Sequence, residues 1–168
     1  MPWLLAEKIN GTERLLVIEA VIFDWGRTLY DSEAGALFPD AAAVVEYLAR
    51  TCTLAIVALI TQGDYEMGAR DRRAILRDAG LAPYFATILF AREDKDRLYA
   101  RALEQVGRRA CEIAIVDDRV QRGIRWGNRH GATTVWLRRG KFRDELPTAD
   151  TGQPTHIVSA LADLHKVL

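Results

Sequence analysis

The chain has 168 residues, 49% of them hydrophobic, which is enough to build one packed core and excludes a disordered tail. Its 23 basic and 23 acidic side chains give a formal net charge of zero, so there is no overall electrostatic reason to bind nucleic acid or an anionic membrane. Twelve arginines lie between Arg92 and Arg143 and could form a local positive face, although solvated helix surfaces are the more common explanation.

Apolar runs of strand length alternate with helical patterns along the chain. An Asn10-Gly11 pair between residues 4–9 and 12–18 predicts a hairpin, so residues 1–20 form either an edge hairpin or an arm used in dimerisation. Asp40 is placed to cap the first helix, and Gly80, Gly107 and Gly131 are placed to end later ones. The expected strands are 21–24, 54–60, 87–90, 113–116 and 133–137, and the expected helices are 41–50, 64–79, 95–106, a segment ending at about His130, and 159–168.

This alternation predicts a three-layer α/β/α sandwich with a central parallel sheet. The strands are apolar along their whole length rather than at every second residue, which indicates burial on both faces of the sheet. We expect a single domain that comprises residues 1–168.

Other features predict a soluble cytoplasmic protein. The longest apolar run, residues 54–60, is too short to span a bilayer, and the first residues lack the pattern of a signal peptide. Cys52 and Cys111 have no Cys or His at metal-ligand spacing, so we expect neither a disulfide framework nor a zinc site.

Polar residues follow the apolar segments at four points: Asp24, the run 61–63, Lys95, and the pair Asp117-Asp118. In a parallel sheet the carboxyl ends of the strands lie at one edge, so these groups are expected to meet there. Singly, each has an ordinary explanation, such as a turn cap, a backbone-bonded hydroxyl or a solvated helix start. Adjacent carboxylates at the end of an apolar strand are harder to explain, because they repel each other unless a cation lies between them.

These residue types suit phosphoryl transfer. A carboxylate such as Asp24 can attack phosphorus and form a covalent aspartyl-phosphate. Approaching anions repel, so a divalent cation with hard oxygen ligands, such as Mg2+, is expected; the Gly26 carbonyl can be one ligand without a side chain. The Thr61 hydroxyl and neighbouring N–H groups can hold phosphoryl oxygens, while Lys95 places a positive charge on the transferring group.

In this order, the segments FDWGRTLYD, LITQGD, EDK and IVDDRVQRGI resemble the four motifs of the haloacid dehalogenase-like (HAD) hydrolase superfamily. The resemblance covers about residues 21–140. It implies that Asp24 is the nucleophile, that Lys95 is the stabilising cation and that Thr61 takes part in catalysis by binding phosphoryl oxygen. The implied phosphate-binding residues are Thr61, Gln62, Gly63 and Lys95, and the implied metal ligands are Asp24, Gly26 through its carbonyl, Asp118, and Asp117 as a ligand or a supporting neighbour.

The sequence departs from the family pattern at two glycines. Phosphatases of the family usually have a second Asp two residues after the nucleophile, where this chain has Gly26. A later acidic position of the fourth motif is Gly123. Loss of a general acid typically costs about 10²- to 10⁴-fold, so we expect weak activity biased toward activated phosphates. Carboxylates that could supply an acid from elsewhere are Glu19, Asp31 and Glu33.

The spacing of the motifs leaves no room for a cap domain. Thr61 lies 33 positions after Thr28 and 34 positions before Lys95, and core elements already fill both intervals. We therefore expect a capless chain. This weakens the dehalogenase and phosphonatase interpretations, although Asp-Trp-Gly is similar to the Asp-Trp-Ala of the phosphonate-cleaving branch.

The leading hypothesis is a capless, Mg2+-dependent HAD-like phosphatase that acts on a phosphorylated small molecule or macromolecule, with no membrane or nucleic acid as partner. Its main rival is a regulatory protein that keeps the metal and phosphate site but has lost efficient turnover. A third hypothesis is a structural partner that assembles through its N-terminal hairpin, with a homodimer as the simplest form.

Overall fold

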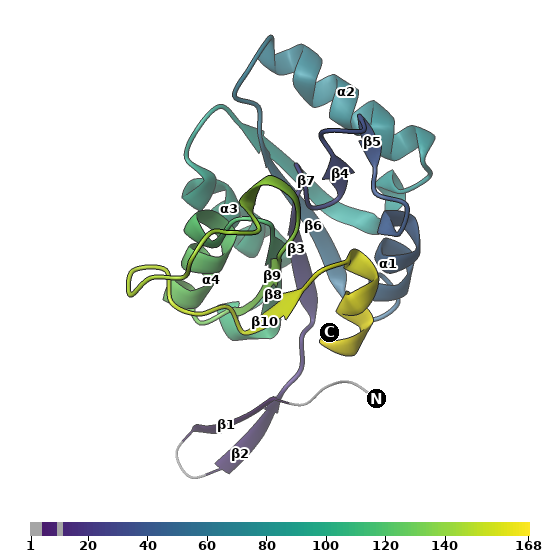
Figure 1. Cartoon of the computed structure of the whole chain (residues 1–168). Coiled ribbons are helices and arrows are strands. Elements are labelled where there is room, and N and C mark those ends of the chain that lie inside the picture. The colour runs from purple at the N-terminus through teal and green to yellow at the C-terminus, as the bar shows by residue number, and fades with distance from the viewer. Residues whose placement is uncertain (1–4, 10–11) are drawn as a thin grey trace.

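The computed structural model describes residues 5–9 and 12–168. Its centre is a six-stranded parallel sheet of order β10-β9-β8-β3-β6-β7, with helices on both faces (Figure 1). This confirms the predicted three-layer α/β/α sandwich. The strands are β1 (Leu5–Ile9), β2 (Thr12–Leu16), β3 (Ala20–Asp24), β4 (Tyr30–Asp31), β5 (Ala36–Leu37), β6 (Thr53–Leu59), β7 (Phe85–Ala91), β8 (Ile113–Asp117), β9 (Thr133–Leu137) and β10 (His156–Val158).

The central strand β3 shows why the sheet is buried on both faces. All five of its residues are buried, and alternate side chains enter two separate hydrophobic clusters. Val21 and Phe23 pack in the cluster that contains residues of α1, while Ala20 and Ile22 pack in the cluster that contains residues of α3. Because successive strand residues point to opposite faces, a continuous apolar run satisfies both layers.

The helices begin and end at residues that satisfy their free backbone groups. Asp64 caps α2 by accepting the N–H of Met67 at 2.8 Å, and Asp94 caps α3 in the same way at 3.0 Å. Gly107 ends α3 in the left-handed region, with φ of 63°. The helical elements are α1 (Ala41–Leu48), α2 (Tyr65–Asp78), α3 (Lys95–Val106) and α4 (Arg125–His130), a π-helical turn η3 (Val120–Ile124), and the 3₁₀ turns η1 (Ala82–Tyr84), η2 (Ala110–Glu112), η4 (Gly140–Phe142) and η5 (Leu161–Lys166).

Two predictions at the ends of elements are wrong. Asp40 precedes α1, but its side chain does not cap that helix. Instead, its Oδ2 accepts the N–H of Ala162 at 3.0 Å, which ties the start of α1 to η5. The expected C-terminal helix 159–168 is only the 3₁₀ turn η5, and the short strand β10 precedes it. A strand of three residues is too short to show a period in the sequence.

The N-terminal hairpin is present: β1 and β2 pair antiparallel from Leu5–Leu16 to Ile9–Thr12. In Figure 1 this hairpin projects from the end of the sheet at which β3 begins. The Asn10-Gly11 turn itself lies outside the described residues. The segments in which a cap domain would be inserted hold only the small β4–β5 hairpin besides elements of the three layers. Of the helices in the described part of the chain, none is long and apolar enough to cross a bilayer.

Candidate active site

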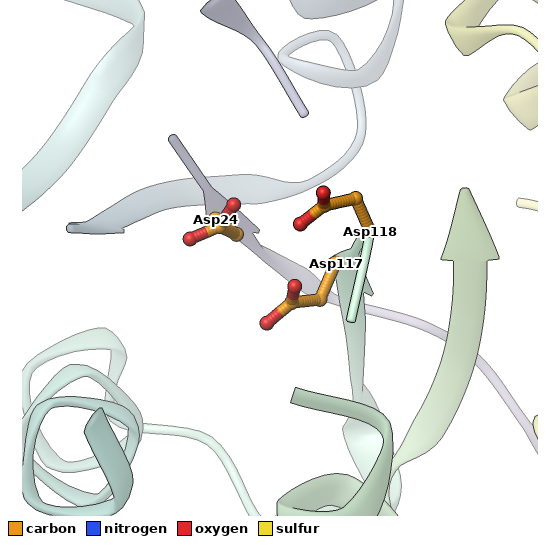
Figure 2. Close-up of side chains that lie close together, drawn as sticks. All are labelled: Asp24, Asp117 and Asp118. Carbon is orange, nitrogen blue, oxygen red and sulfur yellow. The ribbon is translucent and has the colours of Figure 1, made fainter. Parts of the chain in front are cut away.

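Three carboxylates and a lysine meet at the carboxyl end of the central strands. Asp24 is the last residue of β3, Asp117 is the last residue of β8, and Asp118 follows it. Each carboxylate offers an oxygen within 4.8 Å of the others, and Figure 2 shows the three side chains converging. Lys95, the first residue of α3, forms a buried ion pair with Asp24. The structure thus brings together residues that lie up to 94 positions apart in sequence, from Asp24 to Asp118.

Asp24 is held by both of its oxygens. Its Oδ1 is paired with the Lys95 ammonium, which also donates to the carbonyl of Val57 at 3.3 Å. Its Oδ2 accepts a hydrogen bond from the hydroxyl of Thr28 at 3.0 Å. Thr28 is completely buried, and the sequence analysis assigned it no role. Its signal in the sequence was weak, because a threonine in a turn is usually a local backbone partner.

Asp117 and Asp118 have different surroundings. The Asp117 carboxylate is saturated: Tyr99 donates its hydroxyl at 2.6 Å, and the backbone N–H groups of Arg119 and Gly123 donate at 2.9 Å. The Asp118 carboxylate has a buried oxygen, Oδ2, with no hydrogen-bond partner among the described residues. Asp118 is therefore the carboxylate that is free to bind a ligand, and Asp117 lies behind it as a fixed neighbour.

Electrostatics in this cluster favour a bound cation. Burial, together with the neighbouring carboxylates, raises the pKa of both Asp117 and Asp118 above the usual range. A divalent cation would offset this repulsion and would give the orphaned Asp118 oxygen a partner. Carboxylate oxygens are the ligands that Mg2+ prefers, so the residues present fit this ion.

A pocket of about 660 Å³ opens above the cluster. Asp24, Gly26, Lys95 and Asp118 line it, and so do Thr61 and Gln62, which are otherwise exposed. Gly63, predicted to bind phosphate, is not among the lining residues; its carbonyl accepts a hydrogen bond from Arg92 at 2.8 Å.

The two glycines that depart from the family pattern have different environments. A Cβ atom on Gly26 would meet only the Ser32 hydroxyl, at 3.7 Å. A Cβ atom on Gly123 would lie 2.5 Å from the Asp117 carboxylate and 2.6 Å from the Tyr99 hydroxyl. Position 123 therefore has a packing role, because only glycine leaves room for the Tyr99–Asp117 hydrogen bond.

The carboxylates considered as substitute acids lie elsewhere. Glu19 precedes β3, at the opposite end of the strand from Asp24, and pairs with Arg108. Asp31 accepts the N–H groups of two residues that follow it, and Glu33 pairs with Arg27. None of the three lines the pocket.

Comparison with known proteins agrees with this geometry. Residues 94–164 match the family model for HAD-hydrolase-like proteins, and the match contains Lys95, Asp117 and Asp118. The chain superimposes on a haloacid dehalogenase-like family hydrolase from Xanthomonas campestris with a TM-score of 0.68 at 13% identity, over 89% of this chain and 94% of that one. The chain therefore has the fold of HAD-like hydrolases.

Two further similar proteins are longer than this chain. The HAD hydrolase YfnB from Bacillus subtilis, solved with bound magnesium, superimposes with a TM-score of 0.62 at 22% identity, over 78% of this chain and 55% of that one. A glyceraldehyde 3-phosphate phosphatase from Methanopyrus kandleri is 30% identical over 80 residues, which is 45% of this chain. The match spans only about a third of the length of that phosphatase, 34%.

The raised carboxyl pKa values predict how pH and Mg2+ affect stability. For an acid whose pKa is raised on folding, the folded state holds the proton more tightly than the unfolded state. Stability therefore falls as the pH rises through the window between the pKa of the unfolded state and the pKa of the folded state. For Asp118 this window runs from about 4 to about 9. Without metal we therefore expect the thermal unfolding midpoint to fall between these two pH values, and we expect Mg2+ to stabilise the protein most at the alkaline end.

Thermal unfolding with EDTA and with Mg2+, measured at several pH values, tests this. Asp118→Asn should flatten the metal-free profile and remove most of the Mg2+ effect. Other carboxylates titrate too, so the quantity of interest is the difference between the variant and the wild type. Equal Mg2+ stabilisation of both proteins would contradict the assignment of Asp118 as a ligand.

Proposed function

We propose that this chain is an Mg2+-dependent phosphatase that works through an aspartyl-phosphate on Asp24. The observation that supports it best is the placement of Asp24 against Lys95, beside the unpartnered oxygen of Asp118, at the floor of an open pocket. The nucleophile Asp24, the cationic Lys95 and the candidate metal ligand Asp118 lie close together, which is the arrangement that phosphoryl transfer needs.

In the proposed reaction, an Asp24 oxygen forms a bond to phosphorus as the bond from phosphorus to the ester oxygen breaks. The leaving group departs as an alkoxide or phenoxide and takes a proton from solvent. Water then cleaves the bond between phosphorus and Asp24 and releases inorganic phosphate. The Thr28 hydroxyl, 3.0 Å from Oδ2, orients the nucleophile, while Lys95, Thr61 and Gln62 hold the phosphoryl oxygens.

The proposed Mg2+ site consists of the Asp24 and Asp118 carboxylates and the Gly26 carbonyl, with Asp117 in support. When bound, the ion would supply positive charge that offsets the repulsion between the Asp24 carboxylate and the phosphate. Asp117 itself stays fixed by Tyr99 and two backbone N–H groups.

The range of substrates should depend on whether the leaving oxygen needs a proton. Gly26 has no side chain to protonate the leaving oxygen, and the carboxylates considered as substitutes lie outside the pocket. Acyl and aryl phosphates leave without help, whereas alkyl phosphates need a proton. We propose that acetyl phosphate and phenyl phosphate are hydrolysed faster than a sugar phosphate such as glucose 6-phosphate.

The experiment compares kcat/KM for these phosphates in Mg2+ and in EDTA. The expected result is an Mg2+-dependent preference of about 10²-fold or more for the activated phosphates. Equal or faster turnover of the sugar phosphate would show that an acid is supplied in another way. The similarity to a glyceraldehyde 3-phosphate phosphatase supports a phosphate ester as substrate but does not name it.

The absent acid at Gly26 also favours the rival proposal, a regulatory protein that binds metal and phosphate without efficient turnover. Under that proposal, no phosphate in the panel is hydrolysed, yet inorganic phosphate raises the thermal unfolding midpoint only when Mg2+ is present. The two proposals therefore give opposite results in the hydrolysis assay.

A further inference from the structure

The walls of the pocket carry more positive charge than the proposed reaction uses. Six cationic side chains and three acidic ones line the pocket. The cationic residues are Arg27, Arg72, Lys95, Arg119, Arg122 and Lys141, and the acidic ones are Asp24, Asp71 and Asp118.

Half of these cations are already neutralised by a carboxylate. The pairs are Lys95 with Asp24, Arg27 with Glu33, and Arg119 with Glu145. The other three, Arg72, Arg122 and Lys141, form no ion pair with any carboxylate in residues 17–168, where side chains are described. The Arg72 guanidinium donates to the carbonyls of Gly68 and Leu59, and its buried Nε has no partner in the part of the chain that the structure describes.

The free cations divide between two walls. In the sheet, β3 with Asp24 lies between β6 and β8. Arg72 follows β6, on the side of Thr61, where the transferred phosphoryl group is proposed to bind. Arg122 and Lys141 follow β8 and β9, on the opposite side. Arg122 and Lys141 therefore enter the pocket from the other side of β3 than Thr61.

Contacts between their segments fix the backbone that carries these two cations. Glu145 accepts the N–H of Val120 at 2.7 Å and pairs with Arg119, which ties the segment after η4 to the turn η3 that carries Arg122. The Arg119 guanidinium lies 3.7 Å from the centre of the Phe142 ring, next to Lys141 in sequence.

We propose that Arg122 and Lys141 bind a second anionic group of the substrate, a carboxylate or a phosphate remote from the phosphoryl group that is cleaved. This inference rests on the proposed function and narrows its substrate class to small phosphate esters with two anionic ends. The volume of about 660 Å³ is in the range of sites that enclose a whole small molecule rather than one phosphate.

The test uses matched pairs of aryl phosphates. One member carries a para carboxyalkyl chain and the other carries the isosteric neutral carbamoylalkyl chain, in a series of increasing chain length. Leaving groups are then nearly equal, and only the second charge differs. We expect the best carboxylate to exceed its neutral partner in kcat/KM by about tenfold or more, because charge-assisted hydrogen bonds are strong.

The double variant Arg122→Gln/Lys141→Gln should reduce this ratio toward one. Because the ratio is taken within each protein, a general loss of turnover cancels. The control is Arg97→Gln/Arg101→Gln, which removes the same charge from exposed positions of α3 outside the pocket. A wild-type ratio near one at every chain length, or a ratio unchanged in the double variant, would overturn the inference.

Binding of the same pairs is measured by thermal stabilisation with Mg2+, which needs no turnover. If nothing is hydrolysed but the carboxylate still binds about tenfold more tightly, dependent on Arg122 and Lys141, the second site stands and the proposed phosphatase fails. If phenyl phosphate is hydrolysed but the carboxylate substrates show no preference over their neutral partners, the proposed phosphatase stands and the second anion site fails. The two proposals therefore fail separately.

Discussion

Replacing Asp24 with asparagine should lower kcat/KM for phenyl phosphate by at least about 10³-fold, because an amide cannot form the aspartyl-phosphate. The side chain keeps its size, so the hydrogen bond with Thr28 and the packing of β3 should survive. The assay is phenol release in Mg2+, together with a search by mass spectrometry for a phosphoryl adduct on the wild-type peptide that contains residue 24.

The matched control is Asp78→Asn, which neutralises an exposed aspartate at the end of α2 and should leave turnover unchanged. Folding of Asp24→Asn must be checked by thermal unfolding, because the change leaves the buried Lys95 without its anionic partner. A folded Asp24→Asn protein that retains a tenth of wild-type activity would rule out Asp24 as the nucleophile.

Introducing a carboxylate with Gly26→Asp should raise turnover of glucose 6-phosphate by about tenfold or more, while phenyl phosphate changes little. The position accepts a side chain, since a Cβ atom there meets only the Ser32 hydroxyl at 3.7 Å. The new carboxylate would supply the proton that an alkoxide leaving group needs. The measurement is kcat/KM for both substrates over a range of pH.

Gly26→Asn is the control, because it adds the same bulk without a proton to donate. A gain with aspartate but not with asparagine, which disappears at high pH as the new acid ionises, would support the missing-acid explanation. Equal gains from both variants would point to packing instead, and no gain from either would favour the regulatory protein that binds without turnover.

The convergence of the site's side chains was predictable from the sequence because they follow a topological rule. Asp24 and Asp118 come at the ends of neighbouring parallel strands, and Lys95 begins a helix after another, so their convergence needs no tertiary detail. Thr28 and Tyr99 were missed for the opposite reason. Their hydrogen bonds to Asp24 and Asp117 are side-chain details that no rule about strand ends gives, and a tyrosine at helical spacing is normally counted as core.

The fold was predictable wherever an apolar run or a helical pattern extended over many residues. All five predicted strands between residues 21 and 137 are present, and so are the helices that precede Gly80 and Gly107. Short elements were not predicted, since β10 has three residues and the β4–β5 hairpin has two in each strand. The role of Asp40 was wrong because a distant N–H group, that of Ala162, binds the side chain in place of the helix start.

A Cβ atom at Gly123 would collide with the Tyr99 hydroxyl and with the Asp117 side chain, which couples three positions of the chain. Among evolutionary relatives of this chain, a larger residue at the position of Gly123 should therefore occur only together with changes at the positions of Tyr99 and Asp117. The set would then mark a lineage, and an ancestor with an acidic residue at the first position would have needed all three exchanges to reach the present arrangement.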